Sequence, residues 1–167
     1  AAALAKLGPL FEDAGVLKIG HNLKYDLTVL ARLGIYVAPY DDSIVMSFDL
    51  DAGLHGHGMD ELAVTHLSHT CIAYKDVVGT GKKQLGFNEI DLKTATRYAA
   101  EDADVTLRLW RRFRARLPME GATRIYEMVD RPLIPVIARM ERHGIKVDRE
   151  RLAQLSRGFD TGIAELE

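Results

Sequence analysis

The sequence has almost no cysteine, no long apolar run and almost no net charge. Cys71 is the only cysteine among 167 residues, which excludes an internal disulfide framework and favours a reducing compartment. No apolar stretch approaches the roughly 20 residues of a membrane-spanning helix, and the N-terminal segment lacks the features of a signal peptide. We therefore expect a cytoplasmic protein with no membrane partner.

The formal net charge of −2 gives no overall attraction to nucleic acid, so any such binding must use local patches. Hydrophobic residues make up 47% of the chain and charged residues 28%, which is the composition of a globular protein. The length suits one domain with a short extension.

The first part of the chain alternates predicted helices and strands, which indicates parallel strands with helices packed against them. The expected elements are a helix over 4–11, a strand over 16–20, a helix that Asn22 caps and that ends at Gly34, a strand over 35–38 that Pro39 stops, and a helix that begins at 41–43.

The second part reads as mostly helical. We expect a loop over 51–58, a helix over 59–67, an irregular segment over 68–88 with a mobile basic loop at 79–83, a long helix over 91–117 ended by Pro118, a helix over 120–129, a helix from Pro132 to Gly144, and a last helix capped by Asp148. The predicted module boundary lies near Pro118 and divides the chain into 1–117 and 118–167.

The run His21-Asn22-Leu23-Lys24-Tyr25-Asp26 lies at the junction of a buried strand and a helix. In open α/β sheets, ligands bind at such carboxyl ends of strands. Asp26 is therefore a candidate site residue. The alternative is that its carboxylate only complements the positive end of the helix dipole.

A second candidate is the run Tyr98-Ala99-Ala100-Glu101-Asp102-Ala103-Asp104 within the long helix. Tyr98 and Asp102 are four residues apart and share a face. The small residues around them, Ala99, Ala100 and Ala103, would let this helix approach the sheet closely. Burying the Asp102 carboxylate on that face is unfavourable unless a cation or hydrogen-bond donors accompany it. Glu101 and Asp104 are expected on a solvated face, with Asp104 paired to Arg108.

KIGHNLKYD resembles the second exonuclease motif, and RYAAEDADVT the third, of the family A bacterial DNA polymerases, the DNA polymerase I family. The resemblance continues in order through HGMDELA, GTGKKQLGFNEI and DRPLIPVIARMERHGIKVD and covers nearly the whole chain. It implies an α/β, ribonuclease H-like exonuclease fold over 1–117, followed over 118–167 by connecting helices and the start of the polymerase domain.

The resemblance also implies site roles. Asp26 and Asp102 correspond to carboxylates that hold two divalent metal ions, and Tyr98 to a residue that orients the attacking water. Asn22 and Tyr25 correspond to residues beside the terminal nucleotide. Oxygen ligands suit Mg²⁺ or Mn²⁺, and the implied chemistry is two-metal phosphodiester hydrolysis.

The family's first motif, a strand carrying Asp-x-Glu, is expected before the segment that begins this sequence. We therefore expect a fold truncated at its N-terminus, dominated by helices, with a small parallel remnant of the sheet. The metal site is expected to be incomplete and the chain alone inactive. An open sheet flank favours self-association, or cover by the N-terminal helix.

Other residues admit two interpretations. Tyr74 resembles an aromatic position that stacks on frayed single-stranded DNA, or it anchors a packed loop. A zinc site is disfavoured because the spacing fits no structural zinc pattern and a second cysteine is missing; the residues considered for it are His55, His57, His66, His69 and Cys71.

The function that this resemblance implies is that of a DNA polymerase, a nucleotidyltransferase of DNA replication and repair, whose 3′→5′ proofreading exonuclease removes mispaired nucleotides. Its partners would be a single-stranded DNA 3′ end and the remaining polymerase domain. One alternative is a catalytically silent scaffold of the same family. Another is an exoribonuclease, which does not explain the segment PLIPVIARMERHGIKVD.

Overall fold

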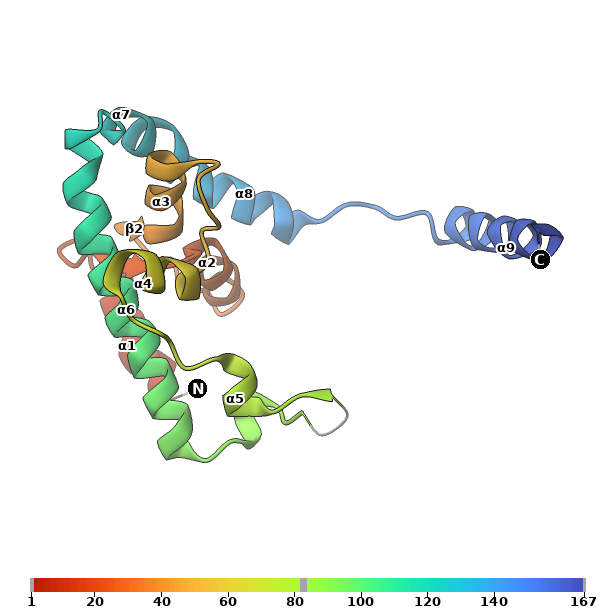
Figure 1. The fold of residues 1–167 in the computed structure, drawn as a ribbon, viewed down its shortest axis with the longest axis horizontal. Helices are drawn as coiled ribbons and strands as arrows, with labels where there is room; N and C mark the ends of the chain where they lie inside the picture. Colours follow the sequence, from red (N-terminus) through yellow and green to blue (C-terminus); the bar gives the residue numbers. More distant parts are fainter. Residues whose placement is uncertain (1, 82–83, 167) are drawn as a thin grey trace.

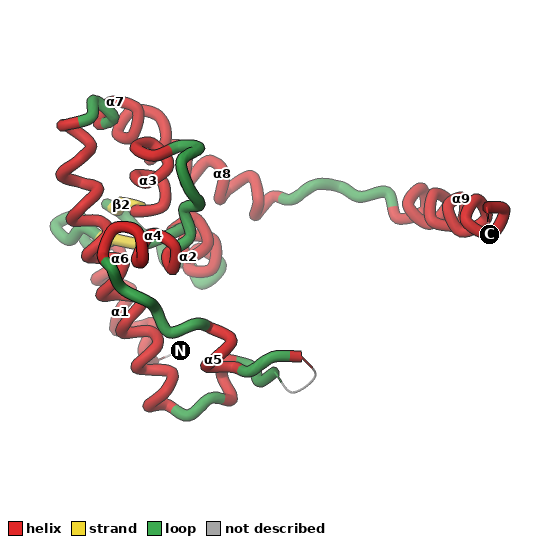
Figure 2. The backbone as a smooth tube through the Cα atoms, in the orientation of Figure 1, coloured by secondary structure: helices red, strands yellow, loops and turns green. Residues whose placement is uncertain are grey.

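The structure, a computed structural model, describes residues 2–81 and 84–166 and is dominated by helices around two short parallel strands (Figure 2). The strands are β1 (Lys18–Gly20) and β2 (Tyr40–Asp42). The helices are α1 (Ala2–Glu12), α2 (Leu23–Ala31), α3 (Ser43–Asp51), α4 (Met59–Leu67), α5 (Tyr74–Val78), α6 (Leu92–Met119), α7 (Thr123–Ile125), α8 (Arg131–His143) and α9 (Arg149–Leu166), with a 3-10 turn η2 (Phe87–Glu89) and a π-helical segment η3 (Tyr126–Asp130). The expected helix-dominated α/β architecture with a small parallel sheet is confirmed.

The position predicted for the second strand is wrong. Tyr40, not a residue of 35–38, pairs with Lys18. The Lys18 amide also donates to the carbonyl of Pro39 at 3.0 Å, so pairing starts at the proline, which needs no N–H there. The apolar run instead contributes packing, since Val37 is buried.

The core lies where α3 and α4 cover one face of α6, the long helix in Figure 1. Val105, Leu109, Phe113 and Leu117 are buried at four-residue spacing along α6, the period of a helix face that packs against a neighbour. Burying each such side chain stabilises the fold by about 1.5–3 kcal/mol.

The chain does not separate from this core at Pro118. Helix α6 continues to Met119, Tyr126 is fully buried, and α8 packs on α2. Helix α9 stands apart at the end of an extended segment (Figure 1), and none of its residues is buried. The division into domains at 117–118 stays a prediction.

Among the helices of the described ranges, none is long and apolar enough to cross a bilayer. The basic loop expected at 79–83 includes Lys82 and Lys83, which lie outside the described residues. The N-terminal helix α1 contacts the segment that leads into β2: the Ala38 amide donates to the Phe11 carbonyl at 3.2 Å. Self-association stays a prediction.

A buried carboxylate ties the sheet to the helices that follow it. Asp41 is 1% exposed. It accepts hydrogen bonds from Trp110 Nε1 at 2.8 Å, the Tyr126 hydroxyl at 3.0 Å and Arg131 Nη1 at 2.9 Å. A buried charge is tolerated only with such partners, so these contacts fix β2 against α6, η3 and α8.

The neighbouring carboxyl groups of Asp49 and Asp130 make the stability of the fold depend on pH. Burial, followed by the neighbouring Asp130 carboxyl, raises the pKa of Asp49 from 3.8 to about 7. Asp49 Oδ2 is buried without a hydrogen-bond partner in the described part of the chain. Because the folded state holds this proton more tightly than the unfolded state, the pair's contribution to stability is present below pH 4 and is lost as the pH rises through 7.

We therefore expect Asp49→Asn to raise the free energy of unfolding more at pH 8 than at pH 5. Urea denaturation at the two pH values measures this difference. Asp104→Asn, whose parent side chain is 63% exposed, serves as the control and should show a much smaller dependence on pH. An Asp49→Asn effect that is equal at both values would contradict the assignment.

Candidate active site

The start of α2 is held by a carboxylate from the neighbouring strand. Asp42 Oδ1 accepts from the Asn22 amide at 3.0 Å, and Asp42 Oδ2 accepts from the Leu23 amide at 2.7 Å. These are two of the unpaired N–H groups at a helix start. The predicted capping role of the Asn22 side chain is wrong, because Asn22 has a left-handed backbone (φ 63°) and its side chain makes no capping hydrogen bond.

The same carboxylate caps α3, since Asp42 Oδ1 also accepts from the Ile44 amide at 3.0 Å. The predicted helix start at 41–43 is thus confirmed, but the capping of α2 was not anticipated from the sequence. Burial raises the pKa of Asp42, while its hydrogen bonds to backbone amides oppose the rise. The sequence did contain a signal for this capping role: Asp41 and Asp42 are adjacent acids at the carboxyl end of β2. Strand β2 pairs with β1, the strand that precedes α2, and polar groups at such strand ends meet at one edge of a sheet.

Asp26 and Asp102 line one cavity of about 620 Å³ between α1, β1, α2 and α6. Asp26 lies on α2, one turn after the capped start, and Asp102 lies in the middle of α6. Tyr25 also lines this cavity. The two carboxylates of the predicted motifs therefore line a common cavity, although they are 76 positions apart in the sequence.

Both carboxylates are partly desolvated. Burial raises the pKa of Asp26. It also raises the pKa of Asp102, which a hydrogen bond from the Tyr98 hydroxyl lowers and the nearby Glu101 and Asp60 carboxylates raise further. In residues 2–81 and 84–166, neither Asp26 nor Asp102 forms an ion pair. Two acids without a basic partner at one cavity wall fit a divalent cation that prefers oxygen ligands, such as Mg²⁺ or Mn²⁺.

Tyr98 lies one turn before Asp102 and belongs to an aromatic cluster with Tyr74 and Phe87. The ring centroids are 6.0–6.3 Å apart, and Tyr74 stacks on Phe87 at an interplanar angle of 16°. Tyr74 is 47% exposed and Phe87 39%, so each packs on the cluster and also presents surface to solvent. Phe87 was not anticipated, because it is a single aromatic in an irregular segment.

The remaining predicted residues are at the surface. Asn22 is exposed, and Tyr25 is 67% exposed at the cavity wall. Asp104 pairs with Arg108 at 3.4 Å, as expected. The prediction that Glu101 lies on a solvated face is wrong. Its carboxylate accepts hydrogen bonds from His69 Nε2 at 3.0 Å and from the Ile72 amide at 2.6 Å. Glu101 therefore fixes the loop after α4 to α6.

Asp60, in the first turn of α4, is a further acid that sequence reasoning missed. Its charge raises the pKa of both Tyr98 and Asp102. No Asp-x-Glu precedes Asn22 in the sequence. The 167 residues therefore supply the candidate acids of the second and third motifs, Asp26 and Asp102, and not the Asp-x-Glu of the first motif.

Comparisons with known proteins identify the family of this chain. The family model for the 3′-5′ exonuclease of DNA polymerase A matches residues 1–118. The chain is 52% identical over 165 residues to DNA polymerase I of Rhizobium leguminosarum, 40% over 173 residues to that of Pseudomonas aeruginosa, and 33% over 169 residues to that of Treponema pallidum. Each alignment covers 99% of this chain but only 16%, 19% and 17% of the respective relative. The chain belongs to the 3′-5′ exonuclease domain family of DNA polymerase A.

Proposed function

We propose that this chain forms most of the proofreading exonuclease of a family A DNA polymerase and helps to remove mispaired nucleotides from a DNA 3′ end. The observation that carries the proposal is the convergence of Asp26 and Asp102, from α2 and α6, on one cavity. Since the chain spans less than a fifth of the relatives' length, DNA synthesis and the remaining polymerase domain are part of the proposal.

In this proposal Asp26 and Asp102 bind the divalent ions through their carboxylate oxygens. Such ions, when bound, lower the pKa of water and stabilise the oxygens of an in-line displacement. Because burial raises the pKa of both acids, protons compete with the ions at acidic pH. The Tyr98 hydroxyl, next to Asp102, orients the attacking water.

The DNA end would be held by aromatic and amide groups near the cavity. Tyr25 lines the cavity and is largely exposed, and Asn22 lies on the same turn of chain, so both are placed to contact the terminal nucleotide. The exposed surfaces of Tyr74 and Phe87 are suited to stacking with bases of the single strand, because every base has an aromatic face.

The C-terminal helices would lead into the polymerase domain. Leu152, Leu155, Phe159 and Ile163 recur at helical spacing on α9 and are 42–68% exposed. A helix with such an apolar stripe is ordinarily covered by a neighbour. This supports the proposal that the C-terminal part of 118–167 leads into the polymerase domain, with α8 as a connecting helix that packs on α2.

In the longer polymerase, Asp102→Ala is expected to reduce 3′→5′ nucleotide release by at least about a thousandfold and to leave DNA synthesis nearly unchanged. The reason is that it removes a metal ligand from the exonuclease site alone. Single-turnover hydrolysis of a labelled mispaired primer measures the first rate, and primer extension the second.

The matched control is Asp104→Ala, which removes an exposed acid from the same helix and should leave both rates intact. The 167-residue chain, assayed in parallel with Mg²⁺ or Mn²⁺, should release no nucleotides. Equal loss of synthesis and editing by Asp102→Ala, in a folded protein, would refute the assignment of Asp102.

Tyr98→Phe is expected to slow editing by about ten- to a hundredfold, less than Asp102→Ala, because it removes a positioning hydroxyl and no metal ligand. The same single-turnover assay gives the rate, and the Mg²⁺ concentration at half-maximal rate should stay close to that of the parent. A loss as large as that of Asp102→Ala would show that Tyr98 has a different role.

A further inference from the structure

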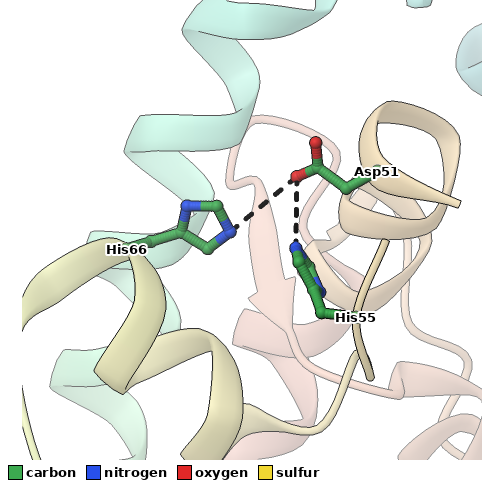
Figure 3. Close-up of side chains that lie close together, drawn as sticks. All are labelled: Asp51, His55 and His66. Atoms are coloured by element: carbon green, nitrogen blue, oxygen red, sulfur yellow. Dashed lines mark ion pairs between the residues drawn. The ribbon is translucent and has the colours of Figure 1, made fainter. Parts of the chain in front are cut away.

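A second group of metal-ligating side chains lies outside the cavity that holds Asp26 and Asp102. Asp51 ends α3, His55 follows in the loop, and His66 lies in the last turn of α4 (Figure 3). Asp51 Oδ2 is 3.7 Å from His55 Nε2 and 3.8 Å from His66 Nε2, and the three ligand atoms all lie within 4.8 Å of one another.

His66 supplies an independent indication of a ligand. Its side chain is 10% exposed, and its Nε2 atom is buried with no hydrogen-bond partner among the described residues. The other side of the ring packs edge-to-face on Phe113, with centroids 5.0 Å apart, so the imidazole is held in place. A buried polar nitrogen without a partner is unfavourable, and coordination of a metal ion would remove that cost.

Asp51 is oriented toward the two imidazoles by Arg116. Arg116 Nη1 and Nη2 donate to the two Asp51 carboxylate oxygens at 2.7 Å each, and Arg116 Nε donates to Glu120 Oε1 at 2.7 Å. A carboxylate oxygen has two lone pairs, so Asp51 Oδ2 can accept from Arg116 and still bind a cation. Hydrogen bonds of this kind commonly fix ligating carboxylates.

We propose that Asp51, His55 and His66 form a binding site for a divalent transition metal of the zinc type. Two imidazoles and one carboxylate suit Zn²⁺ and leave its fourth position for water, whereas Mg²⁺ prefers oxygen ligands in octahedral geometry. The ion would join the ends of α3 and α4 beside α6. The nearby guanidinium of Arg116 opposes a second positive charge, so we expect micromolar rather than tighter binding.

The spacing of the histidines gave no zinc pattern, because the third donor, Asp51, comes from another element. The other group of potential ligands, His69, Cys71 and Glu101, is a weaker candidate. Its imidazole already has a partner, because His69 Nε2 donates to Glu101 Oε1 at 3.0 Å, whereas His66 Nε2 has no hydrogen-bond partner among the described residues. Burial raises the pKa of the Cys71 thiol to about 11, so the thiolate that zinc prefers is scarce near neutral pH.

The test is calorimetric titration of the 167-residue chain with ZnCl₂ at pH 7.5, with Cys71→Ser as the background so that a thiol cannot bind the ion. We expect one equivalent to bind with a micromolar Kd, and Mg²⁺ in excess not to compete. His55→Ala and His66→Ala should each raise the Kd at least about tenfold. The control is His143→Ala, a surface histidine on α8, which should leave the Kd unchanged.

Circular dichroism establishes that each variant is folded. If His66→Ala fails to fold because its ring packs on Phe113, His55→Ala still decides the outcome. Imidazole nitrogen chemical shifts give a second readout, since only His55 and His66 should change on Zn²⁺ binding. Absence of Zn²⁺ binding at micromolar concentration, or unchanged binding by His55→Ala, would overturn the proposal.

Discussion

The structure depends on two adjacent carboxylates at the end of β2. Asp41 and Asp42 are each 1% exposed, and burial of two charges in such a small sheet would be unfavourable without strong partners. Asp42 satisfies the first amides of α2 and α3, while Asp41 accepts from side chains of α6, η3 and α8. The Tyr126 hydroxyl connects the pair, because it accepts from the Asp42 amide at 3.1 Å and donates to Asp41.

These contacts determine the geometry of the candidate active site. The place where Asp42 starts α2 sets the position of Asp26 on its next turn, and the Trp110–Asp41 hydrogen bond holds α6, which carries Asp102, against the same sheet. Strand β1 directly precedes α2 in the chain and contacts α6. Two acids from distant parts of the sequence therefore reach one cavity because a second pair of acids fixes the helices that carry them.

Local patterns in the sequence predicted most elements, and tertiary contacts account for the failures. Helix α4 has the predicted bounds, and Asp148 caps α9 through the Arg151 amide at 2.9 Å. The misplaced second strand and the mistaken Asn22 cap share one cause: pairing of β2 with β1 decided both, and no local propensity reports strand register. Asp26 and Asp102 were recognisable from their motifs, whereas Asp60 and Phe87 acquire their positions only from packing.

If the carboxylate of Asp42 starts both α2 and α3, its removal in Asp42→Ala should change amide hydrogen exchange at the start of both helices. Loss of a cap costs about 1 kcal/mol, so exchange at Leu23 and Ile44 should both accelerate at least about fivefold, while the Leu109 amide in the core of α6 changes least. Acceleration at Ile44 alone, with Leu23 as protected as in the parent, would contradict the claim, because α2 would then begin without Asp42.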